Sequence, residues 1–431
     1  MSNTVTTDRL LRYVDEHREV LLRLLEDLIR IPSENRSPLG AEAECQKNIA
    51  ATLKSVGYEV DVYEADKVDG LFAHPIARSG RNYTDRPNVA ARRKGSGGGR
   101  SLILSGHIDT VPRGDLPWTR DAFTPERVGN RMYGRGSNDM KAGVAMNLFV
   151  MLALADLRAE LAGDVVFESV VDEEFGGVNG TLAGRLRGYV ADAAVVTEPS
   201  SLRLCAGQRG GRTAHLLFKA QGGVLASVAG ASVVDQITYF LTRLPEFAAQ
   251  RRNSYRPHPL YAAAPDPIPV IVTKITTGPW GTSEPITVPE QGGIELYWQL
   301  MPDETQAQVD GEFFAWVDSI LQAPHAPQAQ RPEITFAVAW LPGSAIAAES
   351  EVCRVMQQAA YETLGRRLEI CGLEAPCDLY VFHQFGVPAI LWGPSGGQTH
   401  GSDEWVEIDS VVDAAKALLR FVYDWCGNSA R

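Results

Sequence analysis

The stretch Leu102-Ile-Leu-Ser-Gly-His107-Ile-Asp109-Thr-Val-Pro112 joins a continuous apolar run to a histidine and an acid. Such a run is typical of a strand that is buried on both faces of a sheet. His107 and Asp109 are two residues apart, so they project from one face of an extended chain. An imidazole is a good zinc ligand, and a carboxylate on the same face can hold its other nitrogen. Alone, the pattern also fits an ordinary loop histidine, so the ligand interpretation depends on the neighbouring segments.

Two further apolar runs, 165–171 and 193–196, predict buried strands of the same kind. Between the first two strands lies an apolar segment, 142–157, that is hydrophobic on most sides and predicts a buried helix. Strands that alternate with helices indicate a parallel or mixed sheet with helices on both faces. The predicted fold class is therefore α/β.

Acidic residues occur where these strands end. Asp139 stands between a glycine-rich turn and the buried helix, where it could also serve simply as a helix cap. The run 172–174, Asp-Glu-Glu, directly follows the second strand, and Glu198 follows the third. Crowded acids cost energy unless a cation or solvent neutralises them, so the alternative is a solvated acidic turn. His400 lies in a second glycine-rich loop near the C-terminus.

These positions predict a metal centre. In open α/β sheets, ligands bind outside the carboxyl ends of the strands. One histidine with two or three carboxylates per ion, one of them shared, is a normal ligand set for Zn²⁺, Mn²⁺ or Co²⁺. A remaining glutamate can then take a proton from metal-activated water. The sequence thus predicts a hydrolase with one or two divalent ions.

The character of the chain changes after Arg209. Half-polar strands are expected over 214–219 and 294–300, with an amphipathic helix between them that contains Ile237 and Leu241. We therefore expect a catalytic domain in two parts, 1–211 and 330–431, interrupted by a smaller α+β domain over 212–329. In the second catalytic part, 352–359 and 411–422 predict helices, and 380–382 and 389–392 predict strands. His215 and His383 lie in strand-like runs and are expected to be structural.

Composition excludes several classes of partner. The formal net charge of −12 argues against nucleic acids and anionic membranes. No apolar run approaches the roughly 20 residues that span a bilayer. The six cysteines include no C-x-x-C pair, which favours a reducing cytoplasm. The expected partner is a small-molecule substrate.

The order of these motifs resembles that of the metal-dependent aminoacylase/glutamate-carboxypeptidase superfamily, which includes acetylornithine deacetylase and succinyl-diaminopimelate desuccinylase. The likeness runs from Leu28-Ile-Arg-Ile-Pro-Ser33 to Glu404-Trp405-Val406. It implies a catalytic α/β domain with an inserted α+β lid and dimerisation domain. It also implies a homodimer or higher homo-oligomer that forms through the lid.

The resemblance also implies a set of metal ligands. His107 and Glu198 would bind one ion, Glu174 and His400 would bind the other, and Asp139 would bridge the two. All of these residue types are retained in the present sequence.

Two catalytic roles follow from the same resemblance. Asp109 would orient His107, and Glu173 occupies the position of the general base. That base accepts a proton from the activated water and later delivers it to the leaving nitrogen.

The lid departs from the family pattern at three places. Relatives usually carry a histidine, an asparagine and an arginine, which bind the substrate carboxylate and the developing oxyanion, partly across a dimer interface. The corresponding positions here are Gly223 or Val224, Ile286 and Gln299. Ordinary N-acyl amino acids are therefore expected to be poor substrates.

Other residues of the lid can supply a different pocket. Arg209 matches a family pattern at the start of the lid, although a surface or hinge arginine is an equally simple interpretation. Trp280, Tyr297 and Trp298 can line an aromatic pocket together with Gln299, although each is more often a packing residue.

The sequence leaves three functions open. The first is hydrolysis of an amide, of N-acyl, peptide-like or allantoate type, in an atypical pocket. The second is an aminohydrolase (deaminase) that releases ammonia from an aromatic amine, as in the 5-nitroanthranilate aminohydrolase branch that the chain also resembles. The third is a non-catalytic metal-binding protein, which the retention of Glu173 argues against.

Overall fold

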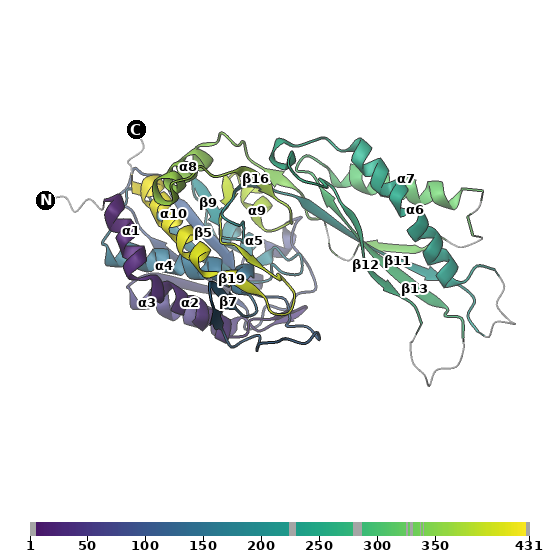
Figure 1. Cartoon of the computed structure of the whole chain (residues 1–431), viewed down its shortest axis with the longest axis horizontal. Helices are drawn as coiled ribbons and strands as arrows, with labels where there is room; N and C mark the ends of the chain where they lie inside the picture. Colours follow the sequence, from purple (N-terminus) through teal and green to yellow (C-terminus); the bar gives the residue numbers. More distant parts are fainter. Residues whose placement is uncertain are drawn as a thin grey trace. The chain divides into compact units, whose positions relative to one another are not determined.

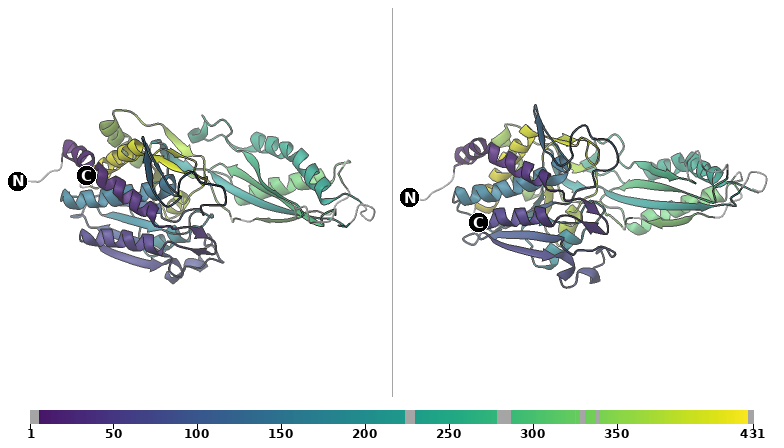
Figure 2. Two further views of the ribbon diagram at one scale, coloured as in Figure 1. Left: turned by 60° about the horizontal axis from the view of Figure 1, so that its bottom comes forward. Right: turned by 90° about the horizontal axis from the view of Figure 1, so that it is seen from below.

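The structure is a computed structural model that describes residues 6–223, 230–278, 287–324, 326–327, 331–336, 338 and 340–427. The chain forms two compact units (Figure 1 and Figure 2). The first comprises Met1–Gly207, Ala345–Leu373 and Cys377–Arg431, and the second comprises Gln208–Ser344 with Glu374–Pro376. Among the described residues, no helix combines the length and apolarity required to cross a bilayer.

A nine-stranded mixed sheet organises the first unit. Its strands follow the order β15-β10-β17-β9-β5-β8-β4-β3, and β16 pairs with β10. Their bounds are β3 (Glu59–Glu64), β4 (Pro87–Arg93), β5 (Leu102–His107), β8 (Val165–Val170), β9 (Ala193–Val196), β10 (Leu204–Gln208), β15 (Ser344–Ala345), β16 (Ile370–Leu373) and β17 (Ala389–Leu391).

The centre of this sheet is parallel. Strand β5 pairs in parallel with β8 and β9, and β9 pairs in parallel with β17. The flanking pairs β4–β8 and β10–β17 are antiparallel. Every residue of β5, β8 and β9 is buried, as expected for apolar strands inside a parallel sheet. The carboxyl ends of the central strands therefore lie at one edge.

Helices cover both faces of the sheet, which confirms the predicted fold class. Helix α4 contacts β5, and α2 and α10 pack on α4. On the opposite face, Ile103 and Val166 pack against Leu379 and Phe382 of α9. The helices of this unit are α1 (Thr7–Glu16), α2 (Arg18–Arg30), α3 (Ala43–Ser55), α4 (Ala142–Asp156), α5 (Asn179–Leu186), α8 (Glu351–Leu364), α9 (Leu379–Gln384) and α10 (Ile408–Gly427).

Smaller sheets shape the loops of the first unit. One hairpin pairs β1 (Asn35–Arg36) with β2 (Leu39–Gly40). A four-stranded sheet has the order β18-β19-β7-β6. Its strands are β6 (Glu126–Val128), β7 (Arg131–Tyr133), β18 (Gly396–Gly397) and β19 (Trp405–Glu407).

The expected strand at 380–382 is wrong, because these residues belong to helix α9. Residues 379–382 are all buried, so the sequence has no polar face from which to recognise a helical period. A short apolar run bounded in this way fits a buried helix as well as a strand. His383 consequently lies at the end of a helix, where its Nε2 is 3.0 Å from the carbonyl oxygen of Ala389.

Among its described residues, the second unit is an antiparallel sheet with two α-helices. The strand order is β12-β13-β11-β14, and β14 extends the sheet beyond position 329, where we expected the inserted domain to end. The elements are β11 (Gly210–Lys219), α6 (Val233–Ser254), β12 (Val270–Thr276), β13 (Gln291–Leu300), α7 (Gln306–Leu321) and β14 (Glu333–Phe336).

Aromatic side chains fill the core of the second unit. Trp298 is fully buried, and its ring lies 5.6 Å from that of Phe247 and 5.0 Å from that of Phe313. Side chains alternate along a strand, so Trp298 faces the helices while Tyr297 and Gln299 face the other side of β13. The suggestion that Trp298 lines a substrate pocket is therefore wrong.

Candidate metal centre

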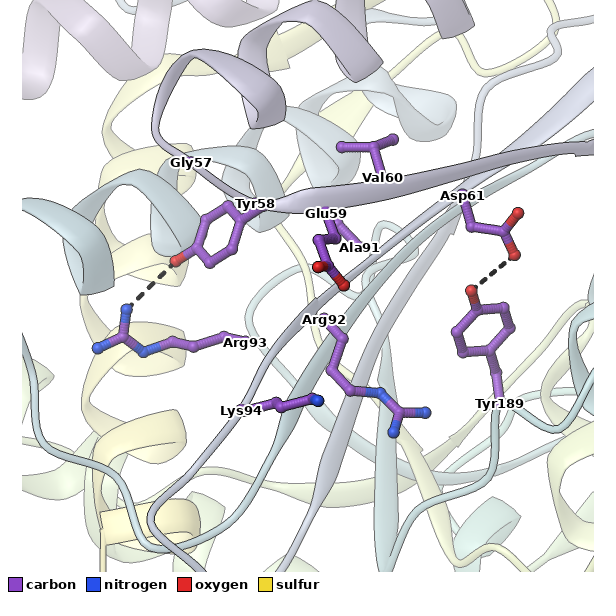
Figure 3. Close-up of a pocket in the computed structure, with 10 residues that line it drawn as sticks. All are labelled: Gly57, Tyr58, Glu59, Val60, Asp61, Ala91, Arg92, Arg93, Lys94 and Tyr189. Atoms are coloured by element: carbon purple, nitrogen blue, oxygen red, sulfur yellow. Dashed lines mark hydrogen bonds between the residues drawn. The ribbon is translucent and has the colours of Figure 1, made fainter.

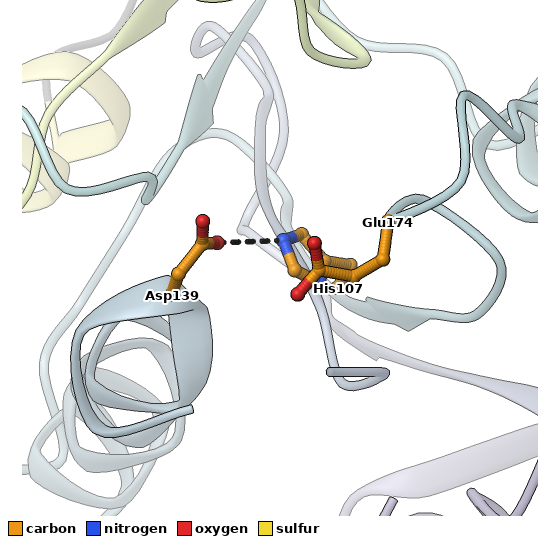
Figure 4. A group of neighbouring side chains, drawn as sticks. All are labelled: His107, Asp139 and Glu174. Atoms are coloured by element: carbon orange, nitrogen blue, oxygen red, sulfur yellow. Dashed lines mark hydrogen bonds and ion pairs between the residues drawn. The ribbon is translucent and has the colours of Figure 1, made fainter. Parts of the chain in front are cut away.

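The central strands bring most of the predicted ligands to one edge. His107 is the last residue of β5, Glu174 follows the end of β8, and Glu198 follows β9. Asp139 precedes α4, and His400 lies in the loop between β18 and β19. Figure 4 shows His107, Asp139 and Glu174, whose potential ligand atoms all lie within 4.8 Å of one another.

Asp139 divides the cluster into two sets. Its Oδ1 lies 3.2 Å from Nε2 of His107, which is also 3.4 Å from Oε1 of Glu198. Its Oδ2 lies 3.3 Å from Nε2 of His400, which is 2.9 Å from Oε2 of Glu174. Each oxygen of one carboxylate therefore faces a different histidine–glutamate pair.

The backbone, rather than a capping role, determines where Asp139 points. Asp139 has φ −117° and ψ 102°, which is not helical, and it follows Gly136 in the left-handed region. Helix α4 begins after Lys141, which makes no side-chain capping bond. Asp139 is therefore not the cap of α4, and its carboxylate turns toward the two histidines.

Asp109 supports the cluster through two different groups. Its backbone carbonyl oxygen lies 2.9 Å from Nδ1 of His107, whereas its carboxylate is 3.6 Å from that nitrogen. The carboxylate accepts backbone N–H bonds from Glu173 and Glu174, at 3.0 and 3.2 Å to Oδ2. Asn35 donates a further bond of 2.9 Å to the same oxygen. Asp109 thus holds the ring through its main chain and fixes the glutamate pair through its side chain.

Glu173 lies beside the ligand sets rather than within them. Its Oε2 is 3.9 Å from Nε2 of His107, farther than the oxygens of Asp139 and Glu198. Its side chain is 15% exposed, against 2% for Glu174. Of the two adjacent glutamates, Glu173 is therefore the one with room for a water molecule.

The cluster concentrates negative charge. Burial, followed by the charge of Asp139, raises the pKa of Glu174 to about 7 against the hydrogen bond from His400. Burial also raises the pKa of Glu173 and of Glu198. Burial alone would lower the pKa of His400, but its bonds to Asp139 and Glu174 raise that pKa to about 11.

A divalent cation relieves this crowding because it neutralises several carboxylates at once. The donor set consists of imidazole nitrogens and carboxylate oxygens, which suits Zn²⁺, Mn²⁺ or Co²⁺. The residues present therefore fit a divalent metal site.

Sequence reasoning missed Asp378. This acid lies with His107, Glu173 and Glu198 around a cavity of about 10 Å³, room for about one water molecule. It accepts a 2.5 Å hydrogen bond from the hydroxyl of Thr181. Its position at the N-terminus of α9 was hidden because the following apolar run resembled a strand.

A larger surface groove lies elsewhere in the first unit (Figure 3). It has a volume of about 740 Å³ and contains none of the predicted site residues. Its polar groups are partly satisfied by one another: Tyr189 donates to Asp61 at 2.8 Å, and Arg93 donates to Tyr58 at 3.5 Å. The groove lacks the convergent acids and histidines of the strand edge.

Arg209 and Gln299 lie together in the second unit. A guanidinium N–H of Arg209 donates to Oε1 of Gln299, and the Gln299 amide donates to the carbonyl of Glu374. The guanidinium carbon of Arg209 is 4.8 Å from the centre of the Tyr261 ring. The other lid positions singled out in the sequence, Trp280, Val224 and Ile286, lie outside the described residues.

Comparison with known proteins identifies the family. The sequence model of Peptidase family M20/M25/M40 matches residues 103–424, so the chain belongs to this family. The chain is 25% identical over 446 residues to N-formyl-4-amino-5-aminomethyl-2-methylpyrimidine deformylase of Bacillus subtilis, covering 96% of both chains. It is 25% identical over 414 residues to succinyl-diaminopimelate desuccinylase of Leptothrix cholodnii, covering 93% of this chain and 96% of the relative.

The fold is shared with human carnosine dipeptidase 1, at a TM-score of 0.75 and 13% identity over 96% of this chain and 98% of the dipeptidase. The resemblance found in the sequence and the predicted class of enzyme, a metal-dependent hydrolase acting on C–N bonds, are confirmed. The expected divalent-metal requirement is confirmed at the level of the family and by the candidate site at His107, Asp139 and Glu174.

Treatment with a chelator should abolish activity, and Zn²⁺, Mn²⁺ or Co²⁺ should restore it. Asp139→Asn should lower the metal content more than Glu198→Gln, because Asp139 faces both histidines and Glu198 faces only His107. Elemental analysis of dialysed protein measures both effects, with the exposed Asp8→Asn as control. Full activity of metal-free protein would contradict the metal requirement.

Proposed function

We propose that the chain hydrolyses a small N-acyl amide, with Asp139 bridging two divalent ions and Glu173 as the general base. The observation that carries this proposal is the division of the cluster by Asp139 into two histidine–glutamate sets. His107 and Glu198 would hold one ion, and His400 and Glu174 would hold the other. The carboxylate of Glu173 lies 3.9 Å from Nε2 of His107, beside these two pairs and outside both.

The residues of the chain divide the chemistry between them. When bound, the divalent ions polarise a water molecule and the substrate carbonyl, which makes attack by that water easier. The oxygen of the water molecule bonds to the carbonyl carbon, and Glu173 accepts the proton that this water loses. Glu173 then donates this proton to the leaving nitrogen as the C–N bond breaks. Asp109 keeps Glu173 in place because its carboxylate accepts the backbone N–H of that residue.

Glu173→Gln should lower kcat by about 10²–10⁴-fold, because the amide keeps the size of the side chain but cannot accept the proton. The metal content should remain that of the parent enzyme. Glu174→Gln is the matched comparison, since it should lower the metal content as well. Loss of metal from Glu173→Gln would instead make Glu173 a ligand, and near-normal turnover would assign the proton transfer to another group.

For the substrate, we propose a formamide or similar amide of an aminomethyl heteroaromatic compound. The relative in Bacillus subtilis deformylates an aminomethylpyrimidine, and it aligns with nearly the whole chain. Such a substrate has no carboxylate, so it does not require the cationic arginine that relatives carry at the position of Gln299. The uncharged Gln299 beside Arg209 supports this choice.

Activity should therefore be higher on N-formyl-aminomethylpyrimidine than on acetylornithine, succinyl-diaminopimelate or dipeptides. Losing one hydrogen bond to a charged group costs about 1.5–3 kcal/mol, so we expect at least about a 10-fold difference in kcat/KM. Gln299→Arg should reduce this difference in kcat/KM, because it restores the cationic residue that relatives carry at this position. The assays should record both amide cleavage and ammonia release. High kcat/KM on a plain N-acyl amino acid would refute the substrate, and ammonia from an aromatic amine would favour the aminohydrolase.

We also propose that the second unit forms a homodimer through strand β12. In the described part of the chain, β12 pairs with β13 on one side only. Ile271 and Ile275 on β12 are 48% and 53% exposed. An exposed apolar edge strand is a template for pairing with another strand. A second copy of β12 fits this edge because it offers the same apolar residues and the same unpaired backbone groups.

Replacing Ile271 and Ile275 with lysine should convert the dimer to a monomer, because the two substitutions remove the apolar contacts between the copies and place additional like charges on the paired strands. Analytical ultracentrifugation measures the mass directly. Val190→Lys is the control, since Val190 is 52% exposed but lies in the first unit. A parent protein that is already monomeric, or a double variant that remains dimeric, would refute this interface.

The proposed setting is the cytoplasm, with a small molecule as the partner. All six cysteines are buried, and none forms a disulfide. Such thiols are typical of reducing compartments. The net charge of −12 disfavours binding to nucleic acids or anionic membranes.

A further inference from the structure

We infer that Arg135 and Glu404 form a buried positioning pair that sets the second ion site, that of His400 and Glu174. The inference rests on the proposed two-ion function and assigns a task to two residues that bond to the backbone of Asp139 and His400 rather than to the side-chain atoms that would hold the ions. Both side chains are 1% exposed, and Nη1 of Arg135 lies 2.7 Å from Oε2 of Glu404. The motifs that contain the predicted metal ligands do not by themselves indicate that Arg135 and Glu404 pair.

The Glu404 carboxylate binds the turn that carries Asp139. Oε1 accepts backbone N–H bonds from Asn138 at 2.9 Å and from Asp139 at 3.0 Å. Oε2 accepts the backbone N–H of Gly136 at 3.0 Å in addition to the guanidinium. Both oxygens are thus fully engaged. One carboxylate, 265 residues away in sequence, holds the backbone of the bridging aspartate.

Arg135 and the turn of Asp139 also form hydrogen bonds with the loop of His400. Nη2 of Arg135 donates to the carbonyl oxygen of His400 at 3.3 Å. Nδ2 of Asn138 donates to the hydroxyl of Thr399, next to His400, at 2.8 Å. These bonds tie the turn of Asp139 to the His400 loop. They therefore set the separation between Oδ2 of Asp139 and the imidazole of His400.

The two ion sites depend unequally on this pair. His107 ends strand β5, and Glu198 follows β9, so the central sheet fixes both independently of Glu404. His400 lies in a loop of the small sheet, and its side chain is 51% exposed. Both sites share Asp139, but only the site of His400 and Glu174 also takes its histidine from a loop that Arg135 and Asn138 hold. Loosening the Arg135–Glu404 pair should therefore weaken that site more than the site of His107 and Glu198.

The test is a titration of metal-free full-length protein with Co²⁺, in which calorimetry and visible absorption measure the binding of each ion. Glu404→Gln keeps the volume but replaces one acceptor oxygen with an NH₂ group, which faces donors that it cannot satisfy. We expect the parent to bind two ions. In the variant, one ion should bind as before and the second about 10–100-fold more weakly, as is typical when a partner behind a ligand is lost.

Glu168→Gln is the matched control because Glu168 and Arg185 form an equally buried pair in the same unit. It should lower the thermal stability but leave both Co²⁺ affinities unchanged. Asn138→Ala removes only the bond to Thr399 and should give a smaller, equally selective weakening. It also serves as the test if Glu404→Gln does not fold.

Equal weakening of both sites, or no weakening of either, in Glu404→Gln and in Asn138→Ala would overturn the inference. The same selective loss in Glu168→Gln would also overturn it, because the effect would then be one of general stability. A parent protein that binds a single ion would contradict the two-ion proposal itself. That outcome is seen before any variant is made, so the two failures are distinguishable.

Discussion

Repulsion between neighbouring carboxylates is the constraint that the structure of the first unit must satisfy. Asp139, Glu174 and Glu198 meet within a few ångströms of two histidines, where partial burial weakens the screening of their charges by water. Such a cluster is stable only if cations or hydrogen-bond donors oppose it. The parallel strands create the problem by ending at one edge, and the divalent ions of this metallohydrolase family resolve it. The arrangement of the parallel strands therefore determines both where the acids lie and why they require a cation.

The protein also fixes the acids near the cluster with hydrogen bonds and ion pairs from residues outside it. Asp172 illustrates the division of labour: it adjoins Glu173 in sequence, but its carboxylate turns away and accepts a 2.6 Å bond from the hydroxyl of Tyr83. Arg81 and Arg86 lie 3.5 and 3.7 Å from the same side chain. Asp172 has φ 69°, a strained conformation for a residue other than glycine, and it directs the next two glutamates toward the ion sets. Of three consecutive acids, Asp172 faces Tyr83 and two arginines, and the other two face the histidines of the cluster.

Substrate choice draws on different physics from catalysis. The cluster at the strand edge is built from charged groups, whereas the buried guanidinium of Arg209 in the second unit donates to the neutral side chain of Gln299. Charge on Arg209 that is already shared with Gln299 and the Tyr261 ring is less available to a substrate carboxylate. Trp298 contributes to packing rather than to recognition, because the alternation of β13 places it inside the aromatic core. The polar groups of Arg209 and Gln299 are thus already engaged within the second unit.

The sequence by itself determined the buried strands, the acids and histidines at their ends, and the class of enzyme. These features are contiguous in the chain: an apolar run and the ligand that follows it are read together, as in 102–109. Only the tertiary structure decided which carboxylate faces which histidine, that Asp172 turns away, and that Asp378 and Glu404 approach the cluster. It also decided that 379–384 is a helix, because burial on every side removes the polar face that would reveal the period. Each of these outcomes depends on packing between segments far apart in sequence, which local patterns do not encode.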